Sequence, residues 1–136
     1  LIGDILAINP ADADLTFNLG VVSGNAGNKV DAEKYYLRAM EIKPDYINAY
    51  INLAALKLDG EKVIIDEMNK LGTSTKDMKR YDELKVKREN IFKSVIPFLK
   101  KGYELDPANV DVAKTLLNVY SALEMTAEYK ALKAKM

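Results

Sequence analysis

The feature that most constrains the fold of this chain is a spacing that recurs around three of its four prolines. Pro10 and Pro44 lie 34 residues apart, and Pro107 follows Pro44 after 63 residues. Leucines lie nine residues after the three prolines, at Leu19, Leu53 and Leu116. The positions two, five and eight residues before them hold Ile8, Ile42 and Leu105, then Ile5, Ala39 and Gly102, then Ile2, Tyr36 and Leu99. Such a period predicts repeated units, each burying an apolar face against its neighbours.

The residues within a unit indicate a pair of closely packed helices. Gly20, Ala32 and Ala39 are small enough for two helices to approach each other. Leu19 and Tyr36 are large and can fill the space between them. The sequence therefore predicts an all-α fold of stacked helical hairpins.

The period and these residues resemble the tetratricopeptide repeat (TPR) family, which places Leu-Gly and Tyr on a first helix and Ala, an aromatic and Pro on a second. The first full unit matches at Leu19, Gly20, Gly27, Ala32, Tyr36, Ala39 and Pro44. The later units match at Tyr50, Leu53, Ala54, Val95, Leu99, Gly102, Pro107, Ala113, Leu116, Leu117 and Tyr120. The resemblance spans nearly the whole chain and implies a TPR-like α-α superhelix of about seven helices.

We expect a single TPR-like domain in four parts. These are residues 1–10, the end of a truncated repeat; 11–44, a repeat; 45–107, a repeat with a 29-residue insertion; and 108–136, a terminal repeat. The chain begins with Leu1, and the apolar spacing up to Ile8 predicts the tail of a helix, so we expect a fragment of a longer protein. The closing helix, residues 127–136, is expected to be short.

The insertion is predicted to lengthen both helices of the middle hairpin. Apolar residues continue at helical spacing over 47–71 and 78–99, which adds roughly 20 Å to each arm. Gly72 is predicted to end the first arm in the left-handed conformation. Ser74 and Asp77 have the spacing of a capping box that starts the second.

Three features of this hairpin leave alternatives open. Gly60 costs about 1 kcal/mol inside a helix and could divide the first arm into two pieces. Pro97 removes a backbone hydrogen bond to Lys93, so we expect a bend in the second arm and not a stop. The charged segment 76–89 is interpreted as a solvated helix face with i,i+4 ion pairs, with a partner contact as the alternative. At the other helix starts, Asp12, Asp45 and Asn109 can serve as caps.

Composition excludes several function classes. Twenty basic and 20 acidic residues balance, which argues against nucleic-acid binding and polybasic membrane binding. The chain has no Cys and no His, which excludes thiolate chemistry, disulfides and His-based triads and argues against a zinc site. No 18-residue apolar run predicts a transmembrane helix. Adjacent acidic residues on a helix do not face each other, and no phosphate-binding loop follows a strand. We therefore expect no catalysis, no cofactor and no metal.

The resemblance implies that the first helix of each unit lines a concave groove for a peptide or partner helix. The groove positions are Asp14, Phe17, Asn18, Val21, Asn48, Ile51, Asn52, Ala55, Asp111, Lys114, Asn118 and Ser121. Asparagine side chains offer a donor and an acceptor to a peptide backbone. Lys114 and Asn118 have the spacing of a family motif that clamps C-terminal carboxylates. The first-unit places hold Phe17 and Val21, however, so such a clamp is not expected.

The sequence thus favours a non-catalytic scaffold that binds a peptide or helix of a partner protein in this groove. The alternative is a structural, self-assembling repeat module of a larger, exported bacterial protein, with homo-oligomers formed through exposed repeat ends. The long second hairpin resembles those of bacterial exported repeat proteins, which points to a periplasmic or exported location. Nothing in the sequence identifies the partner.

Overall fold

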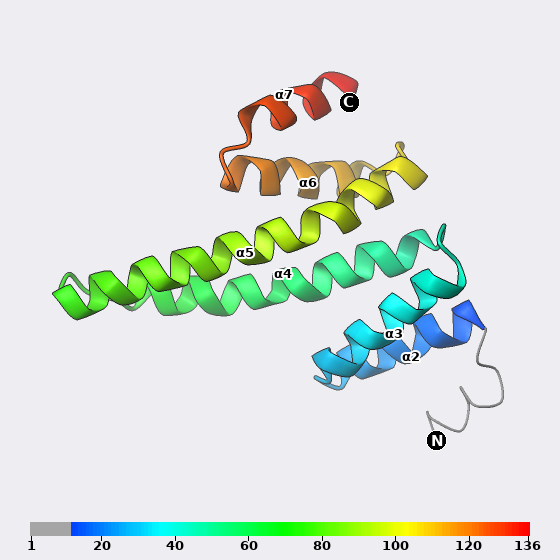
Figure 1. The fold of residues 1–136 in the computed structure, drawn as a ribbon, viewed down its shortest axis with the longest axis horizontal. Helices are drawn as coiled ribbons and strands as arrows, with labels where there is room; N and C mark the ends of the chain where they lie inside the picture. Colours follow the sequence, from blue (N-terminus) through cyan, green and yellow to red (C-terminus); the bar gives the residue numbers. More distant parts are fainter. Residues whose placement is uncertain (1–11) are drawn as a thin grey trace.

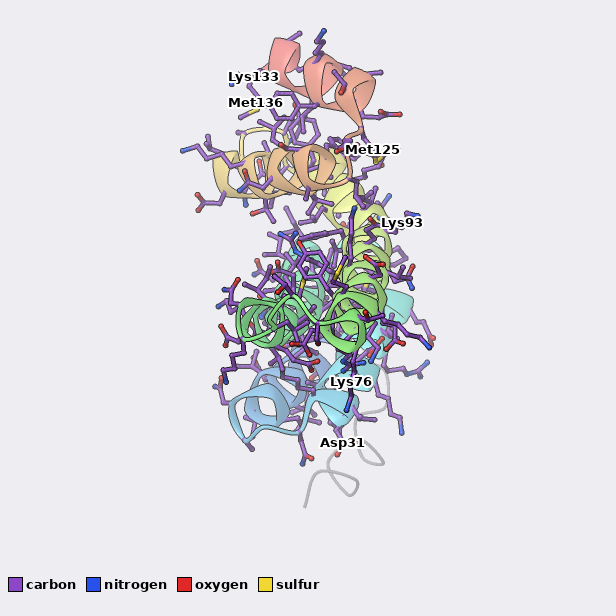
Figure 2. The ribbon with its side chains drawn as sticks, turned by 90° about the vertical axis from the view of Figure 1, so that its left-hand side faces the viewer. Asp31, Lys76, Lys93, Met125, Lys133 and Met136 are labelled. Atoms are coloured by element: carbon purple, nitrogen blue, oxygen red, sulfur yellow. The ribbon has the colours of Figure 1, made fainter. Side chains whose placement is uncertain are left out.

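The structure, a computed structural model, describes residues 12–136. Its six helices are α2 (Ala13–Asn25), α3 (Lys29–Ile42), α4 (Ile47–Asn69), α5 (Thr75–Leu105), α6 (Val110–Ala122) and α7 (Thr126–Lys135). Consecutive helices pair as the hairpins α2/α3, α4/α5 and α6/α7 (Figure 1). Viewed from the tip of the long hairpin, Figure 2 shows these hairpins as successive layers. The expected all-α, TPR-like fold class is confirmed, while the helix expected before Ile8 lies outside the described residues.

The helix starts show how far the outer hairpins repeat each other. Asp12 caps α2 and Asn109 caps α6, each accepting a hydrogen bond from the backbone N–H three residues later, at 3.0 and 3.2 Å. Both caps were expected. Asp45, which was expected to cap or charge the start of α4, does not cap it, because the cap position there is occupied by Tyr46, which makes no side-chain capping bond.

The turns of the outer hairpins also match. Gly27 and Glu124 both have a positive φ, of 84° and 57°. In both turns the following residue donates its N–H to the carbonyl five residues back at 2.8 Å. Glycine adopts this conformation freely, whereas a side chain at Glu124 makes it unfavourable. The second turn therefore carries a strain that the first avoids.

One contact fixes the close approach of α2 and α3. The ring of Tyr36, which is buried, lies directly on Gly20, and a Cβ at Gly20 would meet ring atoms at 2.7 and 2.8 Å. One turn along, a Cβ at Gly24 would meet the Ala32 Cβ at 3.7 Å, an ordinary van der Waals contact. The expectation that small residues bring the helices together therefore applies strictly at Gly20.

The core consists of two clusters that meet at α4. The first joins α2, α3 and the start of α4, and its buried members are Ala32, Tyr36, Ala39, Met40, Ala49 and Leu53. The second joins α4 to α5, α6 and α7, and includes Ala54, Val95, Leu99, Leu116 and Val119. Phe98 packs against both clusters. The three hairpins therefore share one continuous apolar interior.

The middle hairpin is elongated, as expected. Its helices have 23 and 31 residues, which at 1.5 Å per residue gives lengths of about 34 and 46 Å. Figure 1 shows the paired helices extending beyond the rest of the stack. Leu84 is buried in the seam between them. None of the described helices is both long and apolar enough to cross a bilayer.

Ion pairs link the two long helices to each other. Arg80 donates to both carboxylate oxygens of Glu67, at 2.6 and 3.1 Å, and Arg88 donates to Glu61 at 2.7 Å. The hydrogen bond from Arg80 is the main cause that lowers the pKa of Glu67. The charged segment of the second arm therefore does more than solvate a helix face, because two of its arginines link it to α4.

Both long helices are continuous through the residues that were expected to disturb them. α4 continues through Gly60, and α5 continues through Pro97. Gly72 was wrongly expected to be left-handed, since Gly27 is the only glycine with a positive φ among residues 12–136. α4 ends earlier, at Asn69, in a last turn tightened by bonds that span three residues, so no left-handed residue is needed.

The predicted capping box is half formed. Ser74 accepts a hydrogen bond from the Asp77 N–H at 3.1 Å, as expected. The Asp77 carboxylate does not return to Ser74 and instead accepts from the Gly72 N–H at 2.8 Å. The carboxylate, which lies in the first turn of α5, therefore binds the loop between the two long helices.

The Gly20–Tyr36 contact predicts opposite effects for two neighbouring substitutions. Gly20→Ala should lower the free energy of unfolding by about 1–2 kcal/mol, because overpacking outweighs the gain in helix propensity. Gly24→Ala should raise it by up to about 1 kcal/mol, because helix propensity improves without a clash. Urea denaturation followed by circular dichroism measures both. Equal effects of the two substitutions would contradict the packing described.

The strained turn predicts that Glu124→Gly stabilises the chain. Relief of the left-handed conformation is worth about 1–2 kcal/mol, and the greater freedom of glycine in the unfolded chain offsets part of it, so we expect a gain of up to about 1 kcal/mol. At the equivalent turn, Gly27→Ala should have the opposite sign. Thermal unfolding of both variants checks this, and a lower Tm for Glu124→Gly would count against it.

Candidate functional site

Two hollows meet on the face formed by the first helices of the three hairpins. The larger, of about 370 Å³, lies between α4 and α6 and is lined by Ile51, Ala54, Ala55, Leu58, Asp59, Lys62, Leu99, Asn109, Asp111, Val112 and Thr115. The smaller, of about 240 Å³, lies between α2 and α4 and is lined by Val21, Gly24, Asn25, Tyr36, Asn52, Ala55, Leu56 and Asp59. Ala55 and Asp59 line both hollows, which therefore form one surface, here called the α2–α4–α6 groove.

The predicted groove residues separate into three sets. Those that line the hollows are Val21, Ile51, Asn52, Ala55 and Asp111. Those that lie exposed on the first helices, outside the hollows, are Asn18, Asn48, Lys114, Asn118 and Ser121. The remaining two are Asp14 and Phe17, which contact other side chains of the chain itself.

Asp14 and Phe17 help to hold α2 against the start of α4. The Tyr46 hydroxyl donates a hydrogen bond of 2.8 Å to the Asp14 carboxylate. The ring centroid of Phe17 lies 5.1 Å from that of Tyr46 and 5.6 Å from that of Tyr36. Burial, and then the hydrogen bond to Asp14, raises the pKa of Tyr46 from 10.0 to about 12. These side chains therefore have a structural role at the edge of the groove.

Sequence reasoning missed several lining residues, above all Leu58, Asp59 and Lys62. Leu58 and Asp59 are the 34-residue equivalents of Gly24 and Asn25 at the end of α2, whereas Lys62 lies where α4 continues beyond that length. Helical periodicity was the signal that could have found them. Ala55 lies four residues after Ile51, and Leu58, Asp59 and Lys62 follow Ala55 at spacings of three, four and seven residues. Asn109, the N-cap of α6, was also missed as a lining residue.

The polar groups of the larger hollow differ in how far they are engaged. Asn109 accepts the Val112 N–H, and the Thr115 hydroxyl donates to the Asp111 carbonyl at 2.8 Å. The Lys62 amine lies 3.7 Å from the Asp59 carboxylate, and both side chains are mostly exposed. Within residues 12–136 the Asp111 carboxylate takes part in no ion pair. The hollow thus combines an apolar floor with two carboxylates at its rim.

The described side chains form no cluster of potential metal ligands. Over residues 12–136, no group of three or more acidic, Cys or His residues is arranged to hold an ion.

The Tyr46–Asp14 bond predicts a stability difference confined to moderate pH. The neutral hydroxyl stabilises the fold below its unfolded pKa of about 10, and this is lost as the pH rises through about 12. Tyr46→Phe should therefore lower the free energy of unfolding by about 0.5–1.5 kcal/mol at neutral pH, and the difference should vanish near pH 12. Urea titrations across this range measure it. A difference that stays constant would contradict the assignment.

Comparison with known proteins identifies no family and finds distant structural neighbours. No protein-family model matches the sequence, and no curated protein sequence does. The chain is similar to two crystal structures of MamA, at 15% identity and a TM-score of 0.41 in both cases. The alignments cover 98% of this chain and 81% and 76% of those chains.

Proposed function

We propose that the chain is a non-catalytic protein-interaction scaffold that binds a peptide or helix of a partner protein in the α2–α4–α6 groove. The single observation that supports this most directly is the continuity of the two hollows through Ala55 and Asp59. Ile51, Leu58 and Val112 give the groove an apolar floor, on which side chains of a ligand gain free energy by leaving water.

The distribution of asparagines supports recognition of a peptide backbone. The first helices α2, α4 and α6 contain Asn18, Asn25, Asn48, Asn52, Asn69 and Asn118, whereas α3, α5 and α7 contain Asn90 alone. In a helix interior asparagine is a poor helix former, by up to about 0.7 kcal/mol against alanine, so local stability does not explain the interior positions Asn18, Asn52 and Asn118. Within residues 12–136, the side chains of the first-helix asparagines form no hydrogen bond with another group.

The amide chemistry suits a ligand with its own backbone groups to satisfy. Each Asn side chain has a carbonyl oxygen that accepts and an NH₂ that donates, which matches the N–H and C=O of an extended peptide. Asn52 lines the smaller hollow, and Asn118 lies exposed on α6. In our proposal, these amides hold the backbone while the apolar floor takes the side chains.

The proposal predicts that Asn52→Ala with Asn118→Ala weakens peptide binding without weakening the fold. Ligands come from a random heptapeptide library panned against the immobilised full chain, and affinity is measured by fluorescence anisotropy. Loss of two hydrogen bonds of about 0.5–1.5 kcal/mol each predicts roughly 5- to 140-fold weaker binding.

The matched control is Asn90→Ala, an exposed asparagine on α5, which should leave the affinity unchanged. Urea denaturation should show that all variants are at least as stable as the parent, because alanine is the better helix former. A library that yields no binder, or binders indifferent to Asn52 and Asn118, would overturn the proposal.

A further inference from the structure

The larger hollow of the groove has a chemistry that selects among ligand side chains. Its floor is apolar, formed by Ile51, Leu58 and Leu99 among others. Two of the charged residues at its rim are acidic: Asp59 comes from α4 and Asp111 from the first turn of α6. The carboxylates thus come from different helices, and they accept hydrogen bonds but donate none.

The other polar groups of this hollow are either engaged within the chain or easily displaced, so the two carboxylates determine which ligand side chain the rim favours. Asn109 caps α6 with its carbonyl oxygen, and the Thr115 hydroxyl donates to a backbone carbonyl. Lys62 is the one cation lining the hollow among the described residues. Its side chain is 79% exposed and its amine lies 3.7 Å from Asp59, so it forms a weak, solvated pair that an incoming cation can displace.

From this geometry, and resting on the proposed function, we infer that the hollow between α4 and α6 takes a lysine or arginine side chain of the bound peptide. The methylene stem lies on the apolar floor, and the charged head lies at the rim beside Asp59 and Asp111. Lysine and arginine combine an apolar stem with a cationic, donor-only head in this way.

Other side chains satisfy the hollow less well. A purely aliphatic residue covers the floor but gives the Asp111 carboxylate no donor and leaves Asp59 with only the weak Lys62 pair, so it gains nothing at the rim. A glutamate or aspartate adds like charge at the rim. A cation satisfies floor and rim together, because hydrogen bonds between charged partners are stronger than neutral ones. The partner is therefore a protein whose binding segment carries a basic residue.

The experiment pans the random heptapeptide library against the immobilised full chain and against the Asp59→Asn, Asp111→Asn double variant. Peptides selected by the parent chain should be enriched in Lys and Arg at one position, and the double variant should lose this enrichment. For a selected peptide, we expect about tenfold weaker binding to the double variant and a smaller dependence of its affinity on salt.

The matched control is Asp66→Asn, an exposed acidic residue two helical turns beyond Asp59 on α4 and outside the hollow. It makes the same charge change as either of the two single substitutions and should leave both selection and affinity unaltered. If Asp66→Asn weakens binding as much as the double variant, the effect is one of net charge and the inference is wrong.

The remaining outcomes separate this inference from the proposed function. Peptides that depend on Asn52 and Asn118 but show no basic preference, or keep it in the double variant, overturn the inference and leave the groove proposal standing. Failure to select any peptide overturns both. Circular dichroism and urea denaturation of the Asp variants establish that they fold, since both positions are exposed.

Discussion

The structure depends on α4 being covered on two sides at once. Leu53 and Ala54 are neighbours in sequence, both are almost fully buried, and each belongs to a different apolar cluster. Successive residues of a helix point about 100° apart, so one turn of α4 contacts the α2/α3 hairpin on one side and α5 and α6 on the other. Neither neighbouring hairpin buries its apolar face without α4, which is why the three fold as one stack.

This central position also explains where the groove lies. Because α4 lies between α2 and α6, a third part of its surface remains open, and Ala55 lies there immediately after the buried pair. The small side chain of Ala55 keeps the ridge between the two hollows low. Burial of Leu53 and Ala54 therefore fixes the geometry of the exposed face, so that the groove is held by a rigid helix.

The fold was predictable because its determinants recur. A buried residue that returns at the same place in each unit leaves a periodic trace, and Leu19, Leu53 and Leu116 show it even without alignment. End conformations were harder to predict. Gly72 lay in a plausible setting for a left-handed end, but α4 had already closed its last turn at Asn69. Short-range alternatives of this kind differ by about 1 kcal/mol and leave little trace in sequence.

The candidate site was predictable only where it follows the repeat. Val21, Ile51 and Asn52 lie at positions set by the family pattern and line the hollows. Asp14 also lies at a position set by the family pattern, but its carboxylate accepts a hydrogen bond from Tyr46. The two residues are 32 positions apart, so no local sequence signal reveals this contact. Asp59 takes the place that Asn25 has in the first unit, whereas Lys62 lies beyond the end of a standard first helix, where a repeat pattern makes no prediction.

The insertion therefore changes the groove as well as extending the hairpin. Glu61, between Asp59 and Lys62, points the other way and accepts from Arg88 of α5 at 2.7 Å, with only 18% of its side chain exposed. That ion pair links α4 to α5 on the side of α4 away from Asp59, where the helix leaves the stack. A unit of standard length would end its first helix near the place of Asp59 and would lack the Glu61–Arg88 pair and Lys62. The insertion thus lets the same stretch of α4 contact the long arm on one side and line the groove on the other.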